Sequence, residues 1–310
     1  MSRSYESCKK IQRIPVIESE WWRVCEMPDL GELKGQDPER QHIVDHGFIH
    51  AKNGKWILWA CVRGTKVGRL IYGWEGGSLE EGPWQPLGIV VRAQAEYGEK
   101  TEPEEKIGAP FFLKYDGMYY CFYHTGDGIC LMTSDDGKHY TRNLNSEGKS
   151  LQIRQSGRDF LVVKIGTRYF AYSTISTVAK DGWPRSFVIV RTSENLKQWS
   201  DYTIVSEGGI AGNGAVSAES PFVVELDGYY YLFRATSTDF HTYVYRSTTP
   251  YNFGVQDDSR LIARLPIKAP EIICHDGRYY ISDLADFQGI KLAKLRWDED
   301  VDRIFDWSSI

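Results

Sequence analysis

Three carboxylates stand at matching places in a repeated sequence pattern. Asp45, Asp159 and Glu219 each open a short apolar run that leads into a tight turn and then an aromatic strand. If the repeats converge on one axis, these side chains crowd together, and their repulsion raises the pKa of at least one carboxyl group. A protonated carboxyl group beside an ionised one can cleave a glycosidic bond, because the first protonates the leaving oxygen and the second activates water.

The equivalent places in two further repeats hold small residues, Gly108-Ala109 and Ala269-Pro270, with Glu271 following. A single carboxylate at such a place is well explained by strand capping or by a hydrogen bond to a loop N–H group. Three at homologous places are harder to explain in that way. We therefore interpret the three carboxylates as a catalytic set.

The elements that must position this set are five similar segments, each an apolar run, a short turn and an aromatic strand. Their turns stand about 50 to 63 residues apart, which suits a four-stranded sheet with its loops. Asn-Gly and Asp-Gly are strong hairpin signals, because type I′ turns need a positive φ at both central residues. The five turns are Asn53-Gly54, Asp116-Gly117, Ile165-Gly166, Asp227-Gly228 and Asp276-Gly277.

Five such units arranged radially form a β-propeller, in which the first strand of each blade lines the central channel. No linker rich in Pro, Ser or Gly separates the units, and no long helical period supports parallel crossovers. The sequence therefore predicts an all-β, five-bladed β-propeller with four-stranded antiparallel blades, as a single domain over residues 1–310. We expect residues 1–40 to form an N-terminal arm that closes or covers the propeller. The blades are expected to start near residues 45, 108, 158, 219 and 269.

Composition narrows the function further. Aromatic residues make up 14% of the 310 residues, with 29 Gly and 4 Met, which favours strands and tight turns. A net charge of −5 offers no basic excess for a run of phosphates, so nucleic acid is not an expected partner. No apolar stretch approaches the roughly 18 to 20 residues of a membrane span, so no membrane partner is expected.

The six cysteines and the first 17 residues bear on location. The cysteines form no C-x-x-C pair and no zinc-like spacing, and we interpret them as small hydrophobic residues in a reducing compartment. The first 17 residues lack the apolar core of a signal peptide. A cytoplasmic location is therefore expected, although a signal removed beforehand would leave the same sequence. Oligomeric state is not predicted.

The motifs Arg158-Asp159-Phe160 and Glu219-Ser220-Pro221, with Asp45 lying 114 residues before Asp159 and Glu219 lying 60 after it, carry a family resemblance. The chain resembles the five-bladed glycoside hydrolases of family 43 and their relatives in families 32, 62, 68 and 117. The resemblance implies that Asp45 is the general base and Glu219 the general acid. It implies that Asp159 orients the acid and raises its pKa.

The resemblance also implies the reaction. Retaining relatives that act on fructosides open with a Trp-x-Asn-Asp-Pro pattern, where this chain has Ile43-Val44-Asp45-His46, which favours the inverting outcome. We expect an exo-acting enzyme that releases a terminal furanose or pyranose from an oligosaccharide or polysaccharide. No cofactor is required. The histidines predict no catalytic metal, and a structural cation near the axis, which some family members hold, stays open.

Further residues are predicted to contact the sugar. Aromatic rings stack on the C–H faces of sugars, and long polar side chains near the carboxylates can meet hydroxyl groups. For any one Trp, packing in the core explains its presence as well. The predicted contacts are His46, Trp74, Arg158, Trp183 and Arg234.

The sequence also allows two alternatives. The first is a non-catalytic carbohydrate-binding propeller, because no proline follows Asp45 or Asp159, and Asp159 stands seven residues before its turn glycine whereas Asp45 and Glu219 stand nine before theirs. A one-residue slip would turn a strand side chain to the opposite face. The second, a lesser one, is a glycoside phosphorylase. A sialidase is disfavoured, because the spaced Ser-x-Asp-x-Gly-x-x-Trp boxes of that six-bladed fold are missing.

Overall fold

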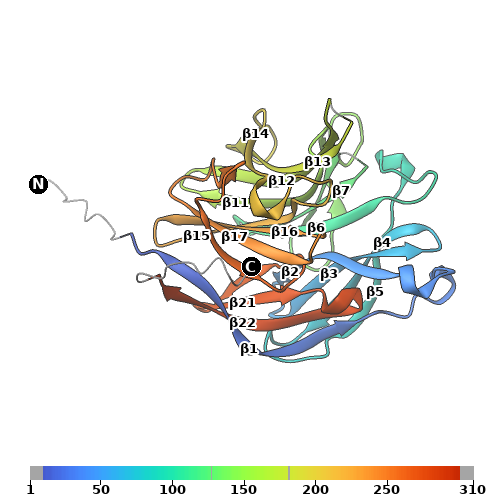
Figure 1. Cartoon of the computed structure of the whole chain (residues 1–310). Helices are drawn as coiled ribbons and strands as arrows, with labels where there is room; N and C mark the ends of the chain where they lie inside the picture. The colour runs from blue at the N-terminus through green and yellow to red at the C-terminus, as the bar shows by residue number, and fades with distance from the viewer. Residues whose placement is uncertain (1–9, 127, 181, 301–310) are drawn as a thin grey trace, which may run out of the picture.

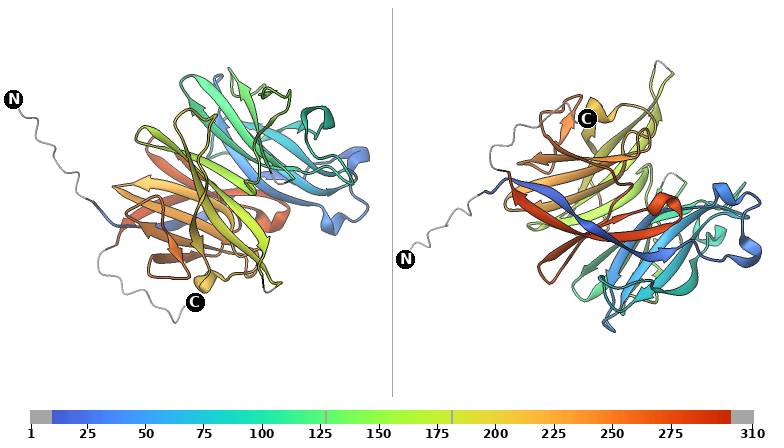
Figure 2. Two further views of the ribbon diagram at one scale, coloured as in Figure 1. Left: turned by 90° about the horizontal axis from the view of Figure 1, so that it is seen from above. Right: turned by 60° about the horizontal axis from the view of Figure 1, so that its bottom comes forward.

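The structure is a computed structural model that describes residues 10–126, 128–180 and 182–300. Strands dominate it, and the helical elements in the described residues are short 3₁₀ turns. Five sheets lie around a common centre, as Figures 1 and 2 show. The inner strands over residues 42–50, 107–115, 158–165 and 219–226 contact one another in turn. The predicted all-β, five-bladed propeller is thus confirmed.

Each blade is an antiparallel sheet whose strands follow one another in sequence. Blade 1 contains β2 (His42–His50), β3 (Trp56–Thr65), β4 (Gly68–Gly76) and β5 (Gln85–Val91). Blade 2 contains β6 (Ile107–Tyr115), β7 (Met118–Thr125), β8 (Gly128–Ser134) and β10 (Leu151–Ile153), with the short β9 (Thr141–Arg142) also beside β8. Blade 3 contains β11 (Arg158–Ile165), β12 (Arg168–Val178), β13 (Pro184–Ser193) and β14 (Thr203–Glu207), and β18 (Gly254–Val255) pairs with β14 in parallel.

The last two blades complete the ring. Blade 4 contains β15 (Glu219–Leu226), β16 (Tyr229–Thr236), β17 (His241–Ser247) and β19 (Leu261–Leu265). Blade 5 contains β20 (Ile272–His275), β21 (Arg278–Asp283), β22 (Gly289–Glu299) and, as its outer strand, β1 (Arg13–Glu26). β1 and β22 lie side by side in Figure 2. The first strand of the chain therefore pairs with its last, while residues 1–9 of the predicted arm lie outside the described residues.

Every inner segment is bent at the same place. One residue near its start has a positive φ, and in the first four blades the pairing register shifts there. A bulge of this kind bends the strand and changes the direction in which its side chains point. The five residues are Asp45 (φ 31°), Ala109 (46°), Asp159 (57°), Ser220 (44°) and Ala269 (46°).

This repeated bend fixes the true alignment of the blades. In blades 2 to 5 the bent residue stands six residues before the last residue of its strand. Asp159 in blade 3 and Ser220 in blade 4 are therefore at equivalent positions. In blade 1, Asp45 stands six residues before Ala51, whose N–H still bonds to the Lys55 carbonyl at 2.8 Å. Asp45 and Asp159 therefore occupy the same register, and Glu219 lies one residue earlier.

The suspected shift of Asp159 is wrong, and turn geometry explains the spacing that suggested it. Gly166, with φ 58°, is the first residue of its two-residue turn, whereas the glycine is the second residue of the turns at Asp116-Gly117 and Asp227-Gly228. Blade 1 has a three-residue loop, 52–54. Distances counted to the turn glycine therefore differ by blade although the strands are in register.

The space between blades is filled by apolar side chains, many of them aromatic. Cys25, Cys61, Cys121 and Cys130 are buried and unpaired, as expected for cysteines that act as small hydrophobic residues. Among the described residues, no helix has the length and hydrophobicity that a membrane crossing requires.

Candidate active site

A cavity of about 350 Å³ opens at one end of the propeller axis. Its wall includes all three predicted catalytic carboxylates, Asp45, Asp159 and Glu219, and the predicted sugar contact Arg158. They come from the inner strands of blades 1, 3 and 4, which lie far apart in the sequence. The bend in each inner strand brings them to one point.

Asp45, at the bend of β2, is half-buried. Its Oδ1 accepts a long hydrogen bond of 3.5 Å from the Ser220 hydroxyl. Burial, together with the nearby negative charge of Asp159, raises the pKa of Asp45 to about 7, against the attraction of Arg69. Asp45 is therefore partly ionised near neutral pH, where a general base works best.

Asp159, at the bend of β11, is 9% exposed and is better supplied with hydrogen-bond donors. Its Oδ2 accepts a hydrogen bond of 3.0 Å from the Ser220 backbone N–H, and the Arg158 Nε lies 3.6 Å away. Ser220 thus contacts both aspartates, through its N–H and its hydroxyl group. Its left-handed backbone is what directs both groups toward the axis.

Glu219 begins β15, next to Ser220. Its Oε1 accepts a hydrogen bond of 3.1 Å from Arg158 Nη2, and its Oε2 accepts a short hydrogen bond from the Ser237 hydroxyl. Burial and the nearby charge of Asp159 raise the pKa of Glu219, while Ser237 and Arg158 oppose the rise. A carboxyl group held in this way can carry a proton into a reaction.

Arg158 connects two of the carboxylates. Its guanidinium contacts Asp159 and Glu219 and also donates a hydrogen bond of 2.8 Å to the Ser176 hydroxyl. These bonds hold Asp159 and Glu219 at a fixed separation. Arg158 also lines the cavity, so its contact with a sugar stays a prediction, while its links to the two carboxylates are part of the structure.

His46, the next residue after Asp45, lines a second and much smaller space that borders the same two aspartates. This space, about 20 Å³, is also lined by Glu271. His46 Nε2 lies 2.7 Å from the Ser282 hydroxyl, and burial lowers the pKa of His46 to about 3, so the ring is neutral. Burial and the charge of Asp45 raise the pKa of Glu271 well above its usual range. The channel below the carboxylates is therefore nearly closed.

The other three predicted sugar contacts do not line the cavity. Trp74 is buried in β4 and packs on the Tyr72 ring, with ring centroids 4.9 Å apart. Trp183 is 72% exposed, close to the start of β13. Arg234 is fully buried and donates hydrogen bonds to three carbonyl groups between residues 208 and 217, so it holds the loop that precedes Glu219.

Phe240 and Phe287 supply the aromatic surface that the tryptophans were expected to provide. Both line the cavity, in edge-to-face contact with centroids 5.8 Å apart, and Phe240 is 44% exposed. Phe287 closes η5 (Ala285–Phe287), in which three successive residues have a positive φ. Such strained backbone is typical of segments that present a side chain to a ligand.

Arg63, Arg69, Lys268 and Ser237 also line the cavity and were not predicted. Arg63 and Arg69 lie on the second and third strands of blade 1, away from the inner-strand starts on which sequence reasoning concentrated. A detectable signal existed for Lys268. It precedes Ala269, so it stands at the position that Glu219 and Arg158 occupy in their blades.

Among the described residues, no three His, Cys, Asp or Glu side chains gather in an arrangement that could hold a metal ion. The groups that meet in the cavity are carboxylates, guanidiniums, hydroxyls, the Lys268 ammonium group, the His42 imidazole and two phenyl rings. Such a set can donate and accept protons and can bind a polar molecule with apolar faces.

Comparison with known proteins supports the fold. Neither protein-family models nor curated protein sequences match the chain. Among solved structures, a thermostable family-43 glycoside hydrolase matches with a TM-score of 0.63 at 16% identity, over 86% of this chain and 92% of that one. An exo-1,5-α-L-arabinanase from a bovine ruminal metagenomic library matches with a TM-score of 0.56 at 17% identity, over 82% and 92%. The β-xylosidase RS223 matches with a TM-score of 0.55 at 14% identity, over 83% and 93%.

These matches cover most of both chains, and the expected likeness to the family-43 fold is confirmed. At identities of 13% to 17% the likeness is one of fold.

Proposed function

We propose that this protein is a glycoside hydrolase with Glu219 as general acid and Asp45 as general base. The observation that carries this proposal is the convergence of three carboxylates on one cavity, with raised pKa values at Glu219 and Asp45. Two carboxyl groups of this kind are the machinery of glycosidic cleavage. The matching solved structures, named as an arabinanase and a xylosidase, support the same reaction class.

The reaction follows from the placement of the protons. The Glu219 carboxylic acid gives its proton to the glycosidic oxygen as the bond from that oxygen to the anomeric carbon breaks. A water molecule adds to the anomeric carbon and its proton passes to the Asp45 carboxylate. Asp159 and Arg158 hold Glu219 in place, and the negative charge of Asp159 favours the protonated acid.

We further propose that the enzyme is exo-acting and inverting. The space below the carboxylates is only about 20 Å³, which leaves little room for a sugar chain to continue along the axis and supports binding of a chain end. The inverting outcome rests on the Ile43-Val44-Asp45-His46 opening. The products can be checked by following the anomeric proton by NMR during turnover, where a retained configuration would overturn the inverting assignment.

No cofactor enters this scheme, since every proton-transferring group belongs to the chain. Activity should therefore survive dialysis against EDTA. Loss of activity that is restored by a divalent cation would contradict this part of the proposal.

A panel of aryl glycosides and unactivated oligosaccharides tests the proposal. The wild type should release sugar from at least one arabinosyl or xylosyl substrate, and Glu219→Gln should lose most turnover on unactivated glycosides while still binding them. Glu225→Gln, an exposed position on the same strand β15, is the matched control and should keep the wild-type rate. Full activity in Glu219→Gln would overturn the assignment, and binding without release of any substrate would identify a carbohydrate-binding propeller instead.

A further inference from the structure

Arg63 and Arg69 form a pair of like charges at the edge of the cavity. They lie directly opposite each other on β3 and β4, and both side chains line the cavity. Like charges placed directly opposite on neighbouring strands destabilise a sheet. A pair of this kind at the wall of a binding site therefore points to a negative group that is absent from the protein itself.

The protein does not neutralise this pair closely. Within the part of the chain that the structure describes, no carboxylate oxygen lies within 4.0 Å of either guanidinium. The other two cations of the cavity differ, because Arg158 contacts Asp159 and Glu219, and Lys268 contacts Asp286 at 2.7 Å. Neither arginine is thus held in a close ion pair, although Asp45, Asp159 and Glu104 attract Arg69 from longer distances.

His42 orients Arg63 without neutralising it. Arg63 Nη2 lies 3.1 Å and Nε 3.4 Å from His42 Nδ1, so this ring nitrogen serves as an acceptor. Burial and the charge of Arg63 lower the pKa of His42, which keeps the ring neutral. The guanidinium is therefore held in one orientation and keeps its full charge, as a preformed site for an anion requires.

The pair stands where the cavity continues outward. His42, Arg63 and Arg69 also line a second hollow of about 320 Å³, whose wall adds Arg40 and Glu104. A sugar chain whose end lies at the carboxylates would extend past the arginine pair into this hollow. The arginine pair would therefore contact sugar units beyond the one that is cleaved.

We propose that Arg63 and Arg69 bind an oxyanion carried by the carbohydrate substrate, a carboxylate or a sulfate ester on a sugar ring. This inference rests on the proposed function for its placement of the sugar chain. The planar guanidinium offers two parallel N–H donors that match the oxygens of either group. The substrate class is accordingly an acidic oligosaccharide.

Binding to the inactive Glu219→Gln variant tests the inference. Calorimetry would compare one neutral oligosaccharide with its uronic-acid and sulfated counterparts, and with inorganic phosphate alone. The acidic ligands should bind at least about tenfold tighter than the neutral one, and Arg63→Gln with Arg69→Gln should abolish the difference. Arg154→Gln, an exposed arginine of blade 2 that lines neither hollow, is the matched control and should leave it intact.

Thermal unfolding of the same variants distinguishes ligand binding from a structural role. The double substitution removes the repulsion between the two arginines but also the hydrogen bond from Arg63 to His42, so Tm should stay close to the wild-type value. Equal affinity for neutral and acidic ligands would overturn the inference. A lower Tm in the double variant, together with an unchanged preference for the acidic ligand, would also overturn the inference, because the two arginines would then have a structural role.

The outcomes separate this inference from the proposed function. Acidic ligands that bind through the arginine pair but are never cleaved would support the inference and contradict the hydrolase. Hydrolysis of neutral glycosides that depends on Glu219, with no advantage for acidic ones, would do the reverse. Turnover that requires inorganic phosphate, with phosphate binding lost in the double variant, would overturn the substrate-borne anion and identify free phosphate as the occupant.

Discussion

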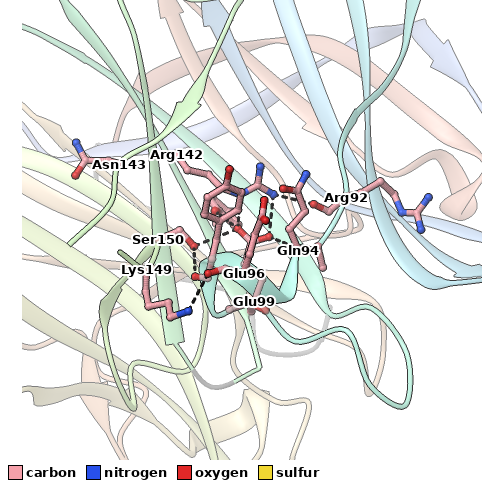
Figure 3. Close-up of polar contacts among 12 residues, drawn as sticks. Arg92, Gln94, Glu96, Glu99, Arg142, Asn143, Lys149 and Ser150 are labelled. Atoms are coloured by element: carbon pink, nitrogen blue, oxygen red, sulfur yellow. Dashed lines mark hydrogen bonds and ion pairs between the residues drawn. The ribbon is translucent and has the colours of Figure 1, made fainter. Parts of the chain in front are cut away.

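Glu99 and Asp45 are both acidic residues turned toward the protein interior, but they differ in the number of hydrogen bonds that their carboxylates accept. Glu99 is 3% exposed and receives five hydrogen bonds, two of them from Arg142 at 2.7 and 2.8 Å (Figure 3). The other donors are the Tyr123 hydroxyl, the Ser150 hydroxyl and the Gln94 N–H. This network joins the loop before β6 to β7 and β9 of blade 2.

Asp45 has no comparable supply of donors. Among the described residues, the Ser220 hydroxyl at 3.5 Å is its one hydrogen-bond donor, and Asp159 adds a like charge nearby. The difference indicates two uses of an acidic side chain. Glu99 is fully compensated and stabilises a blade, whereas Asp45 retains unused acceptor capacity, which a reaction with water requires.

The largest effect on activity is expected from substitutions of Asp45 and Glu219. Asp45→Asn and Glu219→Gln should each lower kcat/KM about 10²–10⁴-fold, because each removes a proton-transferring group. Substrates with a good leaving group need no acid, so Glu219→Gln should recover on an activated aryl glycoside whereas Asp45→Asn should not. Steady-state kinetics on matched activated and unactivated substrates measures this. Equal behaviour of both variants on both substrates would refute the assignment of acid and base.

Substitution of Glu99 should lower the stability of the protein and leave its activity unchanged. Glu99→Gln leaves the half-buried Arg142 without its counter-charge, and since loss of one partner of a fully buried pair costs about 3–5 kcal/mol, the free energy of unfolding should fall by up to that amount. Urea unfolding measures the loss, and the activity of the folded fraction should stay near the wild-type value. Glu147→Gln removes the exposed ion pair with Arg154 and should change stability little. A catalytic defect in folded Glu99→Gln would remove the distinction between the two sites.

The stability of the folded protein should depend on pH through Asp45. Because the folded protein holds the pKa of Asp45 at about 7, above its usual value of 3.8, the folded state binds the extra proton between these two pKa values. Stability should therefore fall as the pH rises from about 4 to about 7. Asp45→Asn, which tolerates the same left-handed backbone, should flatten this part of the profile. Thermal melts of both proteins from pH 4 to 8 measure it, and identical slopes would show that Asp45 ionises normally.

Sequence reasoning could predict the five-bladed architecture because Asp-Gly turns and aromatic strands act locally. It could also predict that Asp45, Asp159 and Glu219 meet, since the repeat brings equivalent positions to the axis. It misjudged the register, because turn glycines were used as the reference. Three bends are marked in the sequence by a small residue followed by proline, at Ala109-Pro110, Ser220-Pro221 and Ala269-Pro270. An alignment on these pairs would have shown that Ser220, and not Glu219, is the residue equivalent to Asp45.

The aromatic wall of the cavity could not be predicted from the sequence, for a physical reason. Phe240 and Phe287 come from loops of blades 4 and 5, where the positions of side chains depend on contacts between distant segments. The conspicuous tryptophan Trp74 is instead used to fill the core, which large apolar rings stabilise most. Arg63 and Arg69 become recognisable as a pair only when the β3–β4 register is known.

The smallest expected effect concerns the support of the acid. Ser237→Ala removes the hydroxyl donor to Glu219, a bond that opposes the rise in the pKa of this carboxyl group. The pKa of Glu219 should therefore rise, and the alkaline limb of the kcat/KM profile should move to higher pH by less than about one unit, since one such bond contributes about 1 kcal/mol. Ser237→Thr keeps the hydroxyl and should restore the wild-type limb. A pH profile that is identical in all three proteins would mean that Ser237 does not act on the acid, and Glu219 would then be supported by Arg158 alone among the donors described.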